Sequence, residues 1–328
     1  MEKLKIYGTI GPACADRKIM EEMFKAGMTG MRLNLSHVDL SDCIEWLEEF
    51  HWAAANTGII PELLIDMKGP ELRIGKFDQP VLLENNTVVD TEKLKFPDIV
   101  YPYLKKGTHI LLDDGNLLIE ILDDEGKQAK VLRGGKLTSS KSIAIEGVSV
   151  PSPTLTEADM NNLSEAYKYA VTGIMQPFVR NAEDLKNVRE ALDSTGNEKL
   201  KIFAKIENQA GVDQIHDLLP HCDEIIIARG DLGNAVGLTR LPSVQHYLEK
   251  VCQEHNKPYM VVTQMLHSMH NNAVPTRAEV SDIYHAVYNG ASSIMLTGET
   301  AAGKYPVEAM RYFVDTAKEA LKDRESGY

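Results

Sequence analysis

The sequence predicts an α/β protein organised around a (β/α)8 TIM barrel. Strand-like and helix-like segments alternate over most of the chain, which is typical of parallel sheets and barrels. Continuous apolar runs at residues 200–204 and 225–228 are typical of strands that are buried on both faces. The length of 328 residues fits one barrel of about 250 residues plus an additional module.

The N-terminal part of the chain begins this alternation. Strands are expected at residues 5–8, 30–33 and 63–66, with helices near residues 18–26 and 41–57. Each expected helix follows one strand and precedes the next, so the strands are expected to lie parallel in one sheet.

Residues 76–148 interrupt the alternation and are expected to form a small, β-barrel-like inserted domain. Short apolar runs, such as residues 110–112, are separated there by turn signals such as Asp113-Asp114-Gly115-Asn116. The barrel domain would then comprise residues 1–75 and 149–328. A module joined to a barrel mouth by two connections is well placed to act as a lid. A passive insertion is the alternative, because long insertions are tolerated at low cost.

The alternation resumes after the insertion. Further strands are expected at residues 173–178, 200–204, 225–228, 259–263 and 292–296, with helices from residues 157 and 182 and at residues 244–255, 277–288 and 307–321. These strands and the three before the insertion make eight, the number that a (β/α)8 barrel requires.

The composition excludes several classes of partner. A formal net charge of −13 argues against binding to nucleic acids and to anionic membrane surfaces, both of which attract basic patches. We find no signal-peptide core and no apolar run long enough to span a bilayer, so a cytoplasmic protein is expected. The cysteines lack paired spacing and are expected to be reduced thiols: Cys14, Cys43, Cys222 and Cys252.

The stretch from residue 199 to 233 carries the strongest chemical signal. Lys205 and Glu207 follow one apolar run and, after a segment the length of one helix, Asp231 follows the next, so parallel pairing would bring all three to the same barrel mouth. Two carboxylates on neighbouring strand ends are suitable ligands for Mg²⁺. A turn is expected after Gly230-Asp231-Leu232-Gly233, where backbone N–H groups could hold an anion. The alternative is a structural ion pair between Lys205 and Glu207.

Seven motifs in this order resemble the pyruvate kinase family over residues 5–317. They are RLNLSH, DMKGPELR, KIENQAGV, ARGDLG, VVTQML, PTRAEVSD and MLTGETAAGKYPVEA. The resemblance implies that Glu207 and Asp231 bind Mg²⁺ (or Mn²⁺) and that Lys205 stabilises charge on the phosphoryl group and the enolate. It also implies that Arg32 binds the transferring phosphoryl group, a task that suits a planar guanidinium.

The remaining roles that the resemblance implies concern the substrate, potassium and the nucleotide. The Gly230 and Asp231 amides would hold the substrate carboxylate, and Thr263 would take part in protonating the enolate. The K⁺ ligands would be Asn34, Ser36, Asp66 and the Met67 carbonyl, and the nucleotide contacts would come from Asn34, His37 and Arg73. Glu71 resembles the potassium-dependent members of the family.

Departures from the family pattern cluster on the nucleotide side. Glu146 and Ala302 stand where lysines near the nucleotide phosphates are usual, while Lys304 lies two residues beyond Ala302. Pro177 replaces a serine near the substrate, and Ala235 replaces a glutamate. The loss of two cations and the gain of one anion would remove charge-assisted contacts of roughly 1.5–3 kcal/mol each.

Three functions are compatible with these residues. The first is a pyruvate kinase-like phosphotransferase that moves phosphate from phosphoenolpyruvate to ADP or another nucleoside diphosphate, giving pyruvate. The second is a diverged metal-dependent enzyme acting on an enolpyruvate or 2-oxoacid without nucleotide transfer, and the third is a non-catalytic metabolite-binding protein. The usual C-terminal regulatory domain is expected to be absent. Arg277 and Glu279 resemble a subunit-packing segment, so a homo-oligomer is expected.

Overall fold

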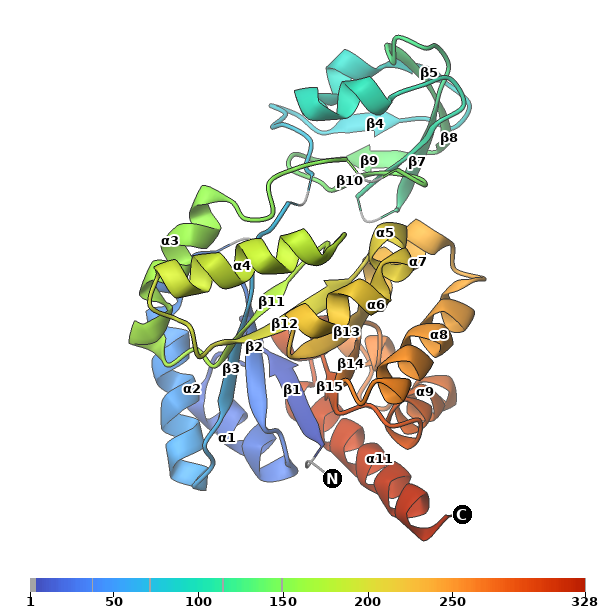
Figure 1. Ribbon diagram of the computed structural model, residues 1–328. Coiled ribbons are helices and arrows are strands. Elements are labelled where there is room, and N and C mark those ends of the chain that lie inside the picture. Colours follow the sequence, from blue (N-terminus) through green and yellow to red (C-terminus); the bar gives the residue numbers. More distant parts are fainter. Residues whose placement is uncertain (1–3, 37, 71, 114, 149, 328) are drawn as a thin grey trace.

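The barrel is confirmed in the computed structural model, which describes residues 4–36, 38–70, 72–113, 115–148 and 150–327 (Figure 1). Within these residues, eight parallel strands close in the order β1-β15-β14-β13-β12-β11-β3-β2. The strands are β1 (Lys5–Thr9), β2 (Gly30–Asn34), β3 (Glu62–Asp66), β11 (Gly173–Gln176), β12 (Lys201–Ile206), β13 (Glu224–Ala228), β14 (Tyr259–Val262) and β15 (Ser293–Met295).

The barrel strands are held by apolar residues on both faces, as their composition predicts. Every residue of β13 and β14 is buried. One group of side chains fills the barrel interior, and alternate residues pack outward against the helices, so both faces of each strand are removed from water. The interior group comprises Tyr7, Leu64, Met175, Phe203, Ile226, Ala228, Met260, Val262 and Met295.

The helices surround the barrel, and several begin at side-chain caps. Asp16 caps α1 by accepting from two backbone N–H groups, while Thr156 and Thr276 form capping boxes at α3 and α9. The helices are α1 (Arg17–Ala26), α2 (Ile44–Thr57), α3 (Glu157–Glu165), α4 (Ala182–Ser194), α5 (Gln209–Asp213), α6 (Ile215–Leu218), α7 (Arg229–Val236), α8 (Leu241–Glu254), α9 (Arg277–Tyr288), α10 (Gly298–Ala301) and α11 (Pro306–Ser326).

The β-rich insertion forms antiparallel sheets between β3 and β11 and has its own apolar core. Its described strands form one five-stranded sheet, β10-β6-β7-β8-β5, and one two-stranded sheet, β4-β9. They are β4 (Val81–Leu83), β5 (Val88–Asp90), β6 (His109–Leu112), β7 (Leu117–Ile121), β8 (Gln128–Arg133), β9 (Gly135–Leu137) and β10 (Ile143–Ile145). We call the insertion the lid. Its boundaries at residues 76 and 148 stay a prediction.

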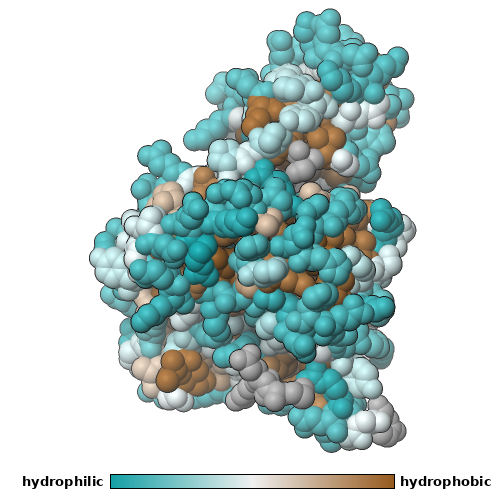
Figure 2. All heavy atoms as spheres, in the orientation of Figure 1, coloured by the Kyte–Doolittle hydropathy of each residue, from teal (hydrophilic) through white to brown (hydrophobic). Residues whose placement is uncertain are grey.

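The lid stands over the carboxyl ends of the barrel strands, and both chain termini lie at the other end of the molecule (Figure 1). The visible surface is mainly hydrophilic, with hydrophobic patches on the half of the lid nearer to the barrel (Figure 2). None of the helices in the described part of the chain has the length and apolarity needed to cross a membrane.

Two local expectations differ from the structure. The expected turn after Gly233 is instead part of α7, which starts directly after β13, so Asp231 lies on the first helical turn. The connection between β12 and β13 is two short helices and a 3-10 turn, Leu219–His221, rather than one helix. Pro220 lies in that turn, where its missing N–H disfavours a longer α-helix.

Candidate active site

Three strand ends bring opposite charges together at the barrel mouth. Arg32, two residues before the end of β2, donates to Asp66 Oδ2 from Nε at 2.8 Å, and its Nη2 lies 2.7 Å from the same oxygen. The Lys205 ammonium approaches the two Asp66 carboxylate oxygens at 3.3 and 3.2 Å. All three side chains point inward by strand alternation, as the barrel pattern requires.

The burial of Asp66 makes these contacts strong. Asp66 is 2% exposed, and burial alone would raise its pKa, yet Lys205 and Arg32 outweigh that effect and hold the pKa below its usual range. Burial would likewise lower the pKa of Lys205, but Asp66 and Glu207 raise it. The mouth therefore keeps a charged ammonium and a charged carboxylate at neutral pH.

Glu207 lies directly after β12 and is held on both carboxylate oxygens. Its Oε1 contacts the Lys205 ammonium at 3.0 Å, so the expected ion pair exists, but it forms part of a larger cluster. Its Oε2 accepts a hydrogen bond from the backbone N–H of Phe178 at 2.9 Å. Phe178 has a positive φ of 53°, an uncommon conformation for a bulky residue that often marks functional sites.

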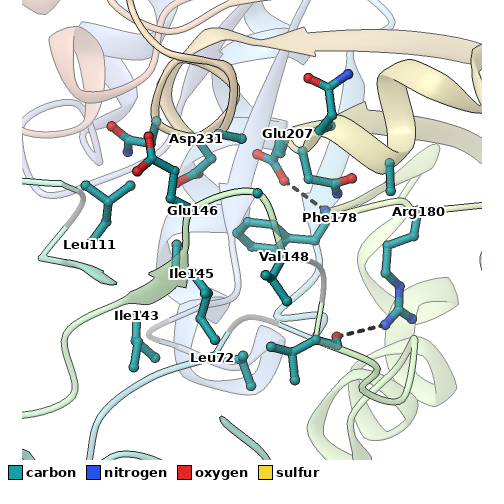
Figure 3. Close-up of a pocket in the computed structure, with 18 of the residues that line it drawn as sticks. Leu72, Leu111, Ile143, Ile145, Glu146, Val148, Phe178, Arg180, Glu207 and Asp231 are labelled. Atoms are coloured by element: carbon teal, nitrogen blue, oxygen red, sulfur yellow. Dashed lines mark hydrogen bonds between the residues drawn. The ribbon is translucent and has the colours of Figure 1, made fainter. Parts of the chain in front are cut away.

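Glu207 and Asp231 line the same cavity, which lies between the barrel mouth and the lid and has a volume of about 310 Å³ (Figure 3). Both carboxylates therefore face one cavity, and their joint binding of a metal ion stays a prediction. Two oxygen-donor side chains suit Mg²⁺, which fills its remaining positions with water and substrate oxygens. Within the described residues, no group of three or more His, Cys, Asp and Glu side chains is arranged to hold a metal.

Thr263 follows β14 directly and has a backbone φ of 83°, which is strained for a β-branched residue. Its carbonyl accepts hydrogen bonds from the Arg229 guanidinium at 3.2 and 2.7 Å, and Arg229 also pairs with Asp282 on α9. A Cβ added at Gly230 would lie 3.2 Å from the Thr263 methyl group. Thr263 and the start of α7 are therefore neighbours.

The residues expected to bind potassium meet at the ends of β2 and β3. Asn34 and Asp66 are register partners, and the Asn34 side-chain oxygen accepts from the Ser36 N–H at 3.1 Å. Met67 is buried and directly follows Asp66. Glu71, which bears on potassium dependence, lies outside the described residues.

The residues expected to contact the nucleotide are less clustered than those expected to bind potassium. Arg73 lies where the chain enters the lid and donates to the Ser140 carbonyl at 2.9 Å, and His37 lies outside the described residues. Glu146 pairs with His109 of the lid at 2.7 Å and lines the cavity. The wall around Glu146 is largely apolar, formed by Leu72, Leu111, Ile143, Ile145, Val148 and Phe178.

Sequence reasoning missed three contributors to this site. The Asp66 bridge between Arg32 and Lys205 could have been found from strand alternation, since all three residues occupy inward positions at strand ends. The Phe178 N–H and the contact of the Arg229 guanidinium with the Thr263 carbonyl carried no sequence signal, because each contact involves a backbone group. Glu279, expected in subunit packing, accepts from Ser268 and caps its own helix.

Comparison with known proteins identifies the family. The family model described as "Pyruvate kinase, barrel domain" matches residues 1–310. The chain belongs to the pyruvate kinase family. A protein named pyruvate kinase from Bacillus licheniformis is 36% identical over 99% of this chain, and one from Geobacillus stearothermophilus is 37% identical over 98%. A third, from Clostridium acetobutylicum, is 35% identical over 98%.

The chain spans 59%, 58% and 71% of those three pyruvate kinases, respectively. The recognised motifs therefore lie in a member of the pyruvate kinase family. The barrel and the separate antiparallel sheets agree with this membership.

Proposed function

We propose that this pyruvate kinase relative transfers the phosphoryl group of phosphoenolpyruvate to a nucleoside diphosphate and releases pyruvate. The observation that carries the proposal is the buried cluster of Arg32, Asp66, Lys205 and Glu207 at the carboxyl ends of three barrel strands. Phosphoryl transfer needs fixed positive charge around the moving group and no covalent intermediate. A buried guanidinium and ammonium held by one carboxylate meet that need.

The residues fit a divalent cation. Glu207 and Asp231 would hold Mg²⁺ or Mn²⁺, because both are oxygen donors on one cavity wall. When bound, the ion supplies positive charge to the phosphate and enolate oxygens. Asn34, Ser36, Asp66 and Met67 would hold K⁺ by the same reasoning, since they gather at two neighbouring strand ends.

Each of the chain's own groups has a separate role in the proposed reaction. Arg32 keeps donors beyond its contacts with Asp66 and Thr9 and would bind the transferring phosphoryl oxygens. The first-turn N–H groups of α7, at Gly230 and Asp231, would hold the substrate carboxylate, because a helix N-terminus favours an anion. Lys205 would stabilise the enolate oxygen. Thr263, beside Gly230, would help to deliver a proton to the enolate carbon.

The side of the cavity around Glu146, where the nucleotide is expected to bind, supports a second candidate. This is a metal-dependent enzyme acting on an enolpyruvate or 2-oxoacid without nucleotide transfer. Glu146 and the apolar wall around it offer little to a polyphosphate, which would meet carboxylates on this side of the cavity. Asn34, Arg73 and His37 remain the candidates for nucleotide binding in the first function. A cytoplasmic homo-oligomer is part of the same proposal.

The test is a lactate-forming coupled assay with metal-loaded, folded protein and a panel of acceptors that includes ADP and GDP. Turnover with any acceptor supports the first function. Exchange of the pyruvate methyl protons without turnover supports the second. The absence of both reactions, with binding of pyruvate detected by calorimetry, would indicate a non-catalytic binding protein.

A further inference from the structure

The segment from Pro177 to Arg180 lies between the lid and the candidate metal carboxylate. At one end, the Phe178 N–H donates to Glu207 Oε2 at 2.9 Å. At the other end, the Arg180 guanidinium donates to the Ser152 carbonyl at 2.8 Å and to the Val150 carbonyl at 3.5 Å. Figure 3 draws two of these hydrogen bonds as dashed lines, the one between Phe178 and Glu207 and the one from Arg180 to the Val150 carbonyl.

Arg180 is fixed on the barrel side. Its side chain is 15% exposed and forms an ion pair with Asp184 of α4 at 2.7 Å, supported by two further hydrogen bonds to the same carboxylate. Burial raises the pKa of Asp184, but Arg180 and Thr154 outweigh this effect and hold it below the usual range. The guanidinium therefore joins helix α4 to the segment through which the chain leaves the lid.

The segment from Pro177 to Arg180 has little conformational freedom, so a displacement of one end is expected to move the other end. Phe178 has a φ of 53°, so its backbone needs support from its neighbours. Val179 is fully buried, and its carbonyl accepts from the Asn208 side chain at 3.2 Å, next to Glu207. A shift of the lid exit is thus passed through a short, packed segment to both Glu207 and Asn208.

We propose that Arg180 is a positioning residue that couples the lid exit to the orientation of Glu207. Arg180 also lines the cavity, but its proposed action on Glu207 runs through Phe178. The planar guanidinium can bind Asp184 and two carbonyl groups at once, which a lysine ammonium cannot do in the same geometry. The proposal rests on the assignment of Glu207 as a metal ligand, but the coupling itself is measurable without metal.

The test compares Arg180→Lys with Arg189→Lys. Arg189 lies on α4, the helix that carries Asp184, and also donates to two backbone carbonyls, those of Glu198 and Leu200, but away from the lid. In metal-free protein, Arg180→Lys is expected to speed amide exchange about tenfold in peptides covering both residues 143–152 and residues 205–212. Arg189→Lys is expected to leave both peptides unchanged.

A second readout is the affinity for Mn²⁺. Arg180→Lys is expected to raise the Mn²⁺ dissociation constant about tenfold, the size typical for groups that orient metal ligands, while Arg189→Lys leaves it unchanged. If Arg180→Lys does not fold, Asp184→Asn weakens the same anchor and replaces it. Faster exchange at residues 143–152 with no change at residues 205–212 would overturn the proposal, as would no change in either peptide.

These outcomes are separable from the failure of the proposed function. Coupled exchange in the two peptides together with inactivity of the wild-type protein toward all acceptors would retain the coupling and remove the kinase function. Turnover by the wild type with uncoupled exchange would retain the function and remove the role of Arg180.

Discussion

The two ends of the barrel each contain a buried carboxylate, but its pKa is shifted in opposite directions at the two ends. The mouth lies at the carboxyl ends of the strands, and we call the end at their amino termini the closed end. At the mouth, Asp66 lies between Arg32 and Lys205, and its pKa is held below the usual range. At the closed end, Glu224 is 9% exposed and accepts from the Ser292 hydroxyl at 3.0 Å and from the Ser293 hydroxyl. Burial is the largest effect there and raises the pKa of Glu224 to about 7.

The difference shows at which end of the barrel buried charged groups remain available to bind a ligand. Cations at the mouth keep Asp66 ionised and leave donors directed at the cavity, which suits the binding of anions. Hydroxyl groups at the closed end only compensate in part for the burial of Glu224. This contrast agrees with the general rule that barrel enzymes place chemistry at the carboxyl ends of strands and stability at the other end.

The largest expected effect comes from removing the cation at the mouth. Lys205→Met should lower the rate of phosphoryl transfer about a thousandfold, because charge on the phosphoryl group and the enolate loses its main ammonium. Steady-state rates in the coupled assay measure this loss.

Lys201→Met is the matched control because Lys201 is on the same strand at the closed end, where it pairs with Glu62 at 3.5 Å and is 55% exposed. We expect less than a twofold change in rate for this variant. Equal losses in the two variants would remove the distinction between the barrel ends.

A second prediction concerns stability at the closed end. Since the pKa of Glu224 is raised in the folded state, its contribution to stability is fully present below about pH 4.5 and is lost as the pH rises to about 7. Glu224→Gln stays neutral, so urea unfolding should show the variant gaining roughly 1–3 kcal/mol relative to the wild type between pH 5 and pH 8.

The activity of Glu224→Gln should stay within twofold of the wild type at pH 7, because the side chain is remote from the mouth. A stability difference that does not change with pH would show that Glu224 is ionised throughout this range.

The smallest expected effect is on nucleotide binding and involves Glu146 of the lid and Ala302 at the end of α10. Glu146→Lys combined with Ala302→Lys should lower the KM for ADP about tenfold by restoring positive charge near the phosphates. Glu125→Lys is the control for the Glu146 exchange, since it makes the same glutamate-to-lysine change on the lid at a side chain that is 72% exposed. An unchanged KM for ADP in the double variant would place the nucleotide elsewhere, or favour the function without nucleotide.

Much of the fold could be predicted from the sequence because the barrel strands are continuous apolar runs. The strand at residues 225–228 is found one residue longer, as Glu224–Ala228, and the helix at residues 277–288 is found unchanged, with Thr276 at its cap. The helical start at Arg229 was missed because Gly230 and Gly233 suggest a turn, whereas packing of Leu232 into the core favours α7.

The site was predictable only where side chains carry it. Lys205, Glu207 and Asp231 follow directly from strand ends, so their convergence could be inferred. The positive φ of Thr263 and the Phe178 N–H contact depend on tertiary packing and have no local sequence pattern. Pro177 and Ala235 are visible as departures in the sequence, but the coordinates were needed to show that Ala235 lines the cavity and that Pro177 lies against Gly69.

The most direct test of the account is a Mn²⁺ titration followed by electron paramagnetic resonance, with Glu224→Gln as a folded control. We predict one Mn²⁺ per chain, with affinity reduced at least tenfold by Glu207→Gln and by Asp231→Asn and unchanged in the control. Unchanged Mn²⁺ affinity in both the Glu207 and the Asp231 variants would contradict the claim that these two carboxylates hold a metal ion beside Lys205 at the barrel mouth.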